Sequence, residues 1–241
     1  MSNKPSSVTL EAFQTILNQR RSVRRFTAEK IPPAITEKCL EMATKAPNSS
    51  NLQPWHFYWV LDEEKKEALK KACLSQNAAK TAAELIVVTA RQDTWQKHAK
   101  WVIANFPAEK VPLVVLDYYT KKVALSYDPG FLGIKGVIKK IASYVIGTQK
   151  PMVRGPFTRA AMKRWAVKST ALAADHLMLA FAAYGYDTCP MEGMDEYRVK
   201  KILGIGRPSE VVMVIAAGRR AENGVYHGQF RLPLEEVMTR V

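Results

Sequence analysis

Apolar side chains recur at helical spacing through most of the chain, and this pattern predicts a protein built largely of amphipathic helices. Near the N-terminus, Leu10, Phe13 and Ile16 share one face, which predicts a helix over about residues 10–19 with Thr9 as its N-cap. The same spacing predicts further helices at about 34–45, 62–74, 95–105, 111–125, 131–146, 159–183 and 196–203.

Runs of β-branched and aromatic residues predict the strands. We expect strands at 56–61, 84–90 and 210–217, and a short extended piece at 186–189. They are scattered among more numerous helices without a regular β-α-β alternation, which predicts the α+β fold class. A chain of 241 residues suits one domain, so we expect a single domain over 1–241 with an unassigned helical insertion at about 94–151.

Two of the predicted helices have distinctive surfaces. The helix at 159–183 is rich in alanine, which lets other elements approach closely, so we expect it to be central and to end near Gly185. The helix at 131–146 is basic and amphipathic; its apolar face holds Ile134, Val137, Ile138, Ile141 and Val145. We expect that face to pack on the body of the protein, the alternative being that the helix lies on a membrane surface.

The charge balance favours anionic partners. Thirty-six lysines and arginines stand against 22 acidic residues, a formal net charge of +14. Such a charge attracts anions of any kind, so nucleic acid is one candidate and a phosphate-bearing cofactor is another. No helix-turn-helix, RNA-binding or zinc-finger motif accompanies the charge, and nucleic acid is therefore not the expected partner.

Several other function classes find no support in the sequence. The longest apolar runs, such as Leu85 to Ala90, are too short to span a bilayer. The first ten residues are polar, without a secretory-type apolar segment, so we expect a cytoplasmic protein. The three cysteines form no C-x-x-C pair and the four histidines show no ligand spacing, so no metal site is predicted.

The first segment with chemical potential is Arg20-Arg21-Ser22-Val23-Arg24-Arg25-Phe26. If it is extended, Arg20, Ser22 and Arg24 point to one side. Guanidinium groups bind phosphate oxygens bidentately and the hydroxyl adds a donor, so the array suits a phosphate. Taken alone, the cluster fits a phosphate site and a solvated basic turn equally well.

The second such segment runs from Ala46 to Trp55, where five amide or hydroxyl side chains lie between two prolines. Polar side chains are common in loops because they satisfy backbone groups locally, and that ordinary interpretation is favoured for such a loop alone. The Gln53-Pro54-Trp55 sequence that follows makes the segment less generic.

Together, in this order, the two segments resemble the N-terminal signature of the nitroreductase family of FMN enzymes. Three downstream sequences are similar to family motifs: Asn77-Ala78-Ala79-Lys80, Pro190-Met191-Glu192-Gly193-Met194-Asp195, and Arg231-Leu232-Pro233. Gln229 departs from the pattern, because many relatives have a basic residue two positions before the C-terminal arginine.

The resemblance implies an FMN site made of Arg20, Arg21, Ser22, Arg24, Pro47, Asn48, Ser49, Asn51, Gln53, Asn77, Lys80, Pro190, Met191, Glu192, Gly193 and Arg231. The N-terminal arginines, Ser22 and Arg231 would hold the phosphate and ribityl chain. Arg24 and Lys80 would give electrostatic support at the pyrimidine edge. The loop at 47–53 would reach the flavin held mainly by the other subunit. No side chain is expected to act as catalytic acid, base or nucleophile.

For fold and activity, the resemblance implies a mixed, largely antiparallel central sheet flanked by helices, in a homodimer with exchanged C-terminal segments. The implied enzyme takes hydride from NADH or NADPH and reduces nitroaromatics, quinones or similar electron-poor small molecules by a ping-pong mechanism. A flavin-binding or flavin-handling protein of the same fold without NAD(P)H turnover is the alternative. A weaker hypothesis is a basic nucleic-acid-binding protein.

Overall fold

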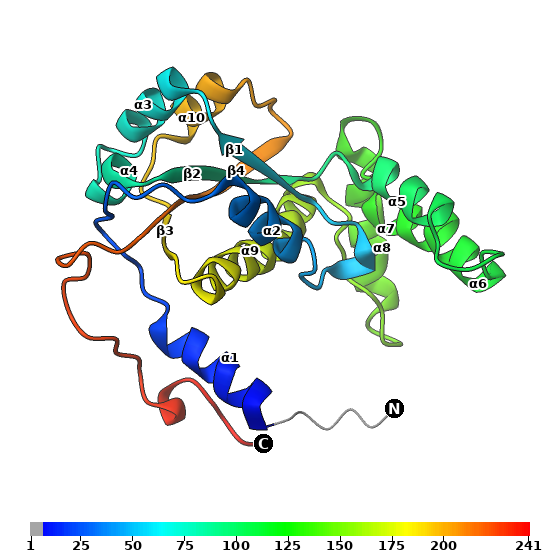
Figure 1. The fold of residues 1–241 in the computed structure, drawn as a ribbon. Helices are drawn as coiled ribbons and strands as arrows, with labels where there is room; N and C mark the ends of the chain where they lie inside the picture. Colours follow the sequence, from blue (N-terminus) through cyan, green and yellow to red (C-terminus); the bar gives the residue numbers. More distant parts are fainter. Residues whose placement is uncertain (1–6) are drawn as a thin grey trace.

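A four-stranded antiparallel sheet in the order β1-β2-β4-β3 forms the centre of the molecule, as the computed structural model of residues 7–241 shows (Figure 1). The strands are β1 (Trp55–Val60), β2 (Glu84–Arg91), β3 (Asp187–Met191) and β4 (Ser209–Gly218). All three strand pairs are antiparallel, so the expectation of a mixed sheet is wrong in this respect. Residues 1–6, and with them most of the polar segment 1–10, lie outside the described residues.

The central strand β2 is buried along nearly its whole length, because both faces of the sheet are covered. Helices α3 (Glu63–Ala72), α4 (Asn77–Thr81) and α10 (Glu196–Leu203) lie on one side. Helices α2 (Pro33–Ala43) and α9 (Arg159–Ala183) lie on the other (Figure 1). Residues alternate between the two faces of a strand, so Leu85 and Val87 join one core cluster, and Ile86 and Val88 the other.

Helix α9 is the long central helix that the alanine-rich sequence predicts, and it ends before Gly185 as expected. It is buried around much of its circumference, with Leu177 and Phe181 fully buried against the sheet. Its N-terminal half packs instead on a third cluster, where Trp165 stacks edge-on against Tyr127 at 4.6 Å between ring centroids. Helix α9 therefore joins the sheet to the helical insertion.

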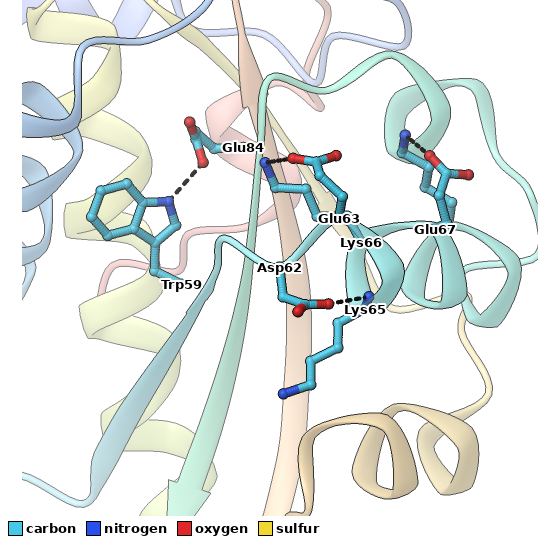
Figure 2. Close-up of polar contacts among 8 residues, drawn as sticks. Trp59, Asp62, Glu63, Lys65, Lys66, Glu67 and Glu84 are labelled. Atoms are coloured by element: carbon cyan, nitrogen blue, oxygen red, sulfur yellow. Dashed lines mark hydrogen bonds and ion pairs between the residues drawn. The ribbon is translucent and has the colours of Figure 1, made fainter.

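Local polar contacts fix the start of α3 and the neighbouring strand ends (Figure 2). Asp62 is the N-cap of α3: its carboxylate accepts a hydrogen bond of 2.8 Å from the backbone N–H of Lys65. The Trp59 indole N–H donates to the carboxylate of Glu84 at 2.6 Å, linking β1 to the beginning of β2. The predicted helix at 62–74 is thus confirmed, two residues shorter at its C-terminal end.

The stretch after β2 is helical. It contains α5 (Trp95–Ala104), α6 (Leu113–Asp117), a π-helical segment η2 (Tyr118–Val123), α7 (Ala124–Tyr127), the turn η3 (Phe131–Gly133) and α8 (Ile134–Ile146). The single helix expected at 111–125 is divided in three by the π-helical segment. In Figure 1 these elements, coloured in shades of green, extend together beyond one end of the sheet.

The orientation of α8 contradicts the sequence-based expectation. Its five apolar side chains, Ile134, Val137, Ile138, Ile141 and Val145, are 51 to 64% exposed. The residues that face the body of the protein are the small Gly136 and Ser143, both buried. The apolar face is therefore not packed on the described chain, and the amphipathic pattern correctly gives the helix but not its contacts.

Helix α1 (Ser7–Gln19) begins earlier than expected, so Thr9 lies inside it and is not its N-cap. Leu10 and Phe13, two residues of the apolar face predicted for this helix, are exposed, and so is Leu17. The end of α1 and the tail residues 229–231 line a common cavity of about 460 Å³. The tail itself has only a short 3-10 turn, η4 (Leu234–Glu236).

Candidate functional site

A cavity of about 660 Å³ lies where the first extended segment, α4 and the C-terminal tail meet. Its lining residues are Arg20, Arg21, Ser22, Arg24, Gln76, Asn77, Ala78, Val225, Tyr226, His227, Gln229, Phe230 and Arg231. Segments more than 200 residues apart in the chain thus form one site. The volume lies in the range that holds drug-sized ligands and cofactors.

Backbone hydrogen bonds hold the segment 20–26 in an extended form beside β3. The Val23 N–H donates to the Thr188 carbonyl at 3.0 Å, and the Phe26 N–H donates to the Thr81 hydroxyl at 3.0 Å. Val23 and Phe26 are buried in the core, which fixes the rotation of the segment. As expected from an extended chain, Arg20, Ser22 and Arg24 all line the same cavity.

Four arginines give the cavity a positive potential. Arg20, Arg21, Arg24 and Arg231 line it, and no aspartate or glutamate of residues 7–241 does. The Arg21 guanidinium donates to the backbone carbonyl of His227, which ties the tail to the first segment. Guanidinium groups, hydroxyls and amides are the donors that anions such as phosphate bind in proteins.

The end of β3 approaches the cavity through two side chains. The Gln76 amide donates to the Gly193 carbonyl at 2.7 Å, and Arg24 Nη1 donates to Cys189 Sγ at 3.5 Å. Burial raises the pKa of the Cys189 thiol, while the charge of Arg24 opposes that rise. The segment Pro190–Gly193 therefore lies next to the arginine cluster: Met191 is buried, and Glu192 and Gly193 are exposed.

Neither steric crowding nor backbone conformation requires a glycine at position 193. A Cβ atom placed there would meet only Gln76 Nε2 at 3.5 Å, an ordinary van der Waals distance. Its backbone φ also lies outside the left-handed region. The absence of a side chain consequently leaves open space beside the cavity without serving the fold.

The structure brings only some of the predicted site residues into one cavity; Pro190, Met191, Glu192 and Gly193 lie beside it without lining it. Arg20, Arg21, Ser22, Arg24, Asn77 and Arg231 line the arginine-rich cavity. Lys80 is exposed in the last turn of α4 and is not among the lining residues. The loop with Pro47, Asn48, Ser49, Asn51 and Gln53 precedes β1, whereas α3 and α4 follow it, so the length of a six-residue strand, about 20 Å, lies between loop and cavity.

That loop is strained and held by the helical insertion. Ser50, Asn51 and Gln53 have φ of 58°, 48° and 43°, in the left-handed region that costs non-glycine residues about 1 kcal/mol or more each. The Ser50 hydroxyl bonds with the Tyr118 hydroxyl at 2.7 Å, and the Tyr119 hydroxyl donates to the Ser50 carbonyl at 3.0 Å.

Two further contacts anchor the same loop. The hydroxyls of Ser49 and Tyr127 lie 3.0 Å apart, and His98 Nδ1 lies 2.7 Å from the Leu52 carbonyl oxygen. Leu52 is fully buried in the cluster that contains Trp165. The insertion therefore positions a loop whose own sequence does not favour its conformation.

Replacement of Tyr127 by phenylalanine should loosen this loop. The substitution removes a hydroxyl that contacts Ser49 at 3.0 Å and Ser50 at 3.4 Å, and should lower the free energy of unfolding by about 1 kcal/mol. Hydrogen exchange of the amides at 48–53 should accelerate, measured against the same change at the exposed Tyr184. Equal exchange rates in both variants would show that the hydroxyl does not hold the loop.

A smaller cavity of about 350 Å³ adjoins the loop. It is lined by Gln53, Trp55, Lys97, His98 and Trp101. Nearby, burial lowers the pKa of His56, and the charges of Arg91, His98 and Lys97 lower it further. An aromatic, cationic surface therefore flanks the strained loop.

Sequence reasoning missed Gln76, Tyr226 and His227 among the lining residues. Gln76 directly precedes the motif Asn77–Lys80, and this position in the sequence is the one feature that could have indicated it. Tyr226 and His227 belong to a tail without periodicity, and only the folded chain brings them to Arg21.

The described residues offer neither a metal site nor a membrane-spanning helix. Within residues 7–241 no group of three or more His, Cys, Asp or Glu side chains is placed to hold a metal ion. None of the helices in that range is both long and apolar enough to cross a membrane.

Known proteins are similar to this chain in sequence and in fold. A sequence model of the Nitroreductase family matches residues 17–219. A Thermus thermophilus NADH dehydrogenase is 28% identical over 228 residues, covering 93% of this chain and 94% of that protein. An oxygen-insensitive NADPH nitroreductase of Helicobacter pylori is 22% identical over 214 residues, covering 87% of this chain and 88% of that protein. An Exiguobacterium sibiricum protein, solved in complex with FMN, matches with a TM-score of 0.70 and 23% identity, covering 100% of both chains.

Proposed function

The chain belongs to the nitroreductase family of oxidoreductases, and from that premise we propose that it binds FMN in the arginine-rich cavity and takes hydride from NADH or NADPH. The electrons pass to an electron-poor small molecule such as a nitroaromatic compound or a quinone. The family predicted from the two N-terminal motifs is thereby confirmed; the cofactor, acceptor and site residues remain proposals.

The cavity fits a cofactor that carries a phosphate. Four arginines and the Ser22 hydroxyl line it, and none of the lining residues within residues 7–241 is acidic. A phosphate would find charge-assisted hydrogen bonds there, whereas a cationic or purely apolar ligand would not. The cavity charge is the observation that carries the proposal.

Each group of residues has a distinct role in this proposal. Arg20, Arg21, Ser22 and Arg231 bind the phosphate and ribityl chain. Arg24 lines the cavity and donates to Cys189 Sγ in β3. From there its guanidinium group supplies positive charge to the pyrimidine edge of the flavin ring. Asn77 offers an amide to the ring, and the Pro190–Gly193 backbone passes beside it. Lys80 does not line the cavity, so its contribution is a long-range electrostatic one.

Bound FMN supplies the redox chemistry, accepting a hydride from the nicotinamide and delivering two electrons to the acceptor. The protein contributes orientation and charge. Guanidinium groups stabilise negative charge that develops near them, and the open space at Gly193 leaves room for the ring.

The strained loop at 47–53 favours a site completed by a second subunit. Within one chain it lies at the far end of β1 from the arginine-rich cavity. In the proposed homodimer, with exchanged C-terminal segments, the loop reaches the flavin of the partner. The exposed apolar side chains of α1, including Leu10 and Phe13, suit burial in such an interface.

The visible absorption spectrum tests this function directly. The purified protein, supplied with FMN, should show a flavin spectrum that bleaches under anaerobic NADH or NADPH and returns when a nitroaromatic compound or quinone is added. Bound flavin that stays oxidised with both nucleotides would favour the alternative of a flavin-binding protein without turnover. A protein that remains colourless after FMN is added would contradict the cofactor assignment.

A further inference from the structure

One side chain links the arginine-rich cavity to the segment that follows β3. Gln76 lines the cavity and is half-buried. Its side-chain amide donates to the Gly193 carbonyl at 2.7 Å and to the Cys73 carbonyl at 3.1 Å. The amide nitrogen of a glutamine has two N–H groups, and both are used in these contacts. The orientation of the Gln76 side chain is therefore fixed by bonds within the chain.

The turn that leads to Gln76 is strained. Leu74 and Ser75, which lie between α3 and α4, have φ of 57° and 53°. Two adjacent non-glycine residues in the left-handed region persist only where the surrounding structure holds them, and such strain is concentrated at functional sites. Here the N–H groups of both residues donate to carbonyls in the last turn of α3, at 3.0 Å each. This conformation brings Gln76 to Gly193, which is 117 residues further along the chain.

A backbone bond fixes the segment after β3 at a second point. The Asp195 N–H donates to the carbonyl of Ala72, the last residue of α3, at 2.8 Å. Just before this contact the chain makes a tight turn centred on Gly193, because the Met194 N–H donates to the Glu192 carbonyl at 2.9 Å. The carbonyl groups of Glu192 and Gly193 are thus both bonded within the chain.

These contacts determine the direction of the neighbouring N–H groups. A trans peptide is planar with its N–H and C=O opposed, so the bonded Glu192 carbonyl orients the Gly193 N–H. Within residues 7–241, the N–H groups of Glu192 and Gly193 donate to no backbone carbonyl. Two oriented donors that the backbone does not use therefore lie next to a cavity that Gln76 itself lines.

We propose that Gln76 is a positioning residue for the flavin chemistry: its bond to the Gly193 carbonyl holds the Glu192 and Gly193 N–H groups toward the ring of bound FMN. The inference rests on the proposed function, because it requires FMN in the arginine-rich cavity. A reduced flavin ring carries more negative charge than an oxidised one, and preorganised N–H donors stabilise such charge. Donors that are free to reorient provide less of this stabilisation.

Amide hydrogen exchange in the flavin-free protein tests the Gln76–Gly193 bond. Gln76→Met keeps the length of the side chain but removes the donor, and Gln76→Asn keeps the amide but is one methylene too short. In both variants the amides of Met194 and Asp195 should exchange about fivefold faster, the factor that corresponds to one hydrogen bond of about 1 kcal/mol. Asparagine is a favoured residue at the N-cap of a helix such as α4, so the second variant should retain the fold.

The FMN-loaded protein tests the consequence for the flavin. In both variants the reduction potential of bound FMN, measured by anaerobic titration with dithionite, should become more negative, because the N–H donors are no longer held at the ring. Flavin reduction by NADH or NADPH should slow about tenfold in a stopped-flow experiment. The affinity for FMN should change little, since the arginines that line the cavity are unaltered.

Gln149→Met is a matched control. It removes an exposed glutamine after α8 and should change neither amide exchange nor the potential. Unchanged exchange in both Gln76 variants would overturn the proposed bond, and faster exchange with an unchanged potential would overturn its role at the flavin. If the unaltered protein bound no FMN, the proposed function and the role at the ring would both be wrong. The exchange experiment needs no flavin, so it distinguishes that outcome from a failure of the Gln76–Gly193 bond.

Discussion

A variant with Arg20→Ala and Ser22→Ala should fold normally and bind FMN roughly 100-fold more weakly than the unaltered protein. Hydrogen bonds to charged groups contribute about 1.5–3 kcal/mol each, so the loss of both side chains should cost about 3 kcal/mol of binding free energy. The effect is this large because the two groups lie side by side in the cavity lining. Fluorescence titration of the flavin-free protein with FMN measures it.

Folding should survive because neither side chain contributes to the core. The buried neighbour is Val23, whose backbone bond to Thr188 is unaffected by the two substitutions. Arg25→Ala is a matched control: it removes an arginine of the same segment that does not line the cavity, and should change FMN affinity little. Equal affinity in the double variant and the control would show that the phosphate is bound elsewhere.

Phe181→Ala should lower the free energy of unfolding by about 3–5 kcal/mol, because it leaves a cavity in a fully packed core. Phe181 is completely buried where α9 meets the sheet. For a chain of this size such a loss corresponds to a drop in the thermal midpoint of roughly 10 °C or more. Thermal unfolding followed by circular dichroism, at one saturating FMN concentration for all variants, provides the measurement.

The control for this prediction is Tyr197→Ala, which truncates an exposed aromatic residue on α10 and should change stability by about 0.5 kcal/mol or less. If Phe181→Ala unfolded at the same temperature as this control, α9 would not be the central element that joins sheet and insertion.

The spacing of apolar residues predicts the helices and strands of this fold well where the pattern is regular. The helices at 159–183 and 196–203 agree with the structure at both ends, and the long strands agree to within one residue. Periodicity reports which face of a helix is apolar, not what covers that face. The orientations of α1 and α8 could therefore not be predicted from periodicity. Each of these helices exposes apolar residues to solvent in the single chain.

The residues of the candidate site also divide into those that the sequence could predict and those that it could not. Arg20, Ser22 and Arg24 could be predicted because three alternate residues of one extended segment carry the chemistry. Gln76 and His227 could not, since their places depend on contacts with Gly193 and Arg21, remote in the sequence. The pairing of the strands also depends on such remote contacts. The resemblance implied a mixed, largely antiparallel sheet, and all three pairs of named strands are antiparallel.

The strand order has a consequence for synthesis of the chain. β4, the last strand to leave the ribosome, lies between β2 and β3 in the sheet. Until residue 218 has emerged, β2 and β3 have no partner on the sides that β4 will occupy. A nascent or truncated chain therefore exposes two open strand edges, which invite pairing with other chains. Its solubility during expression should depend on how quickly the final third of the sequence follows the rest.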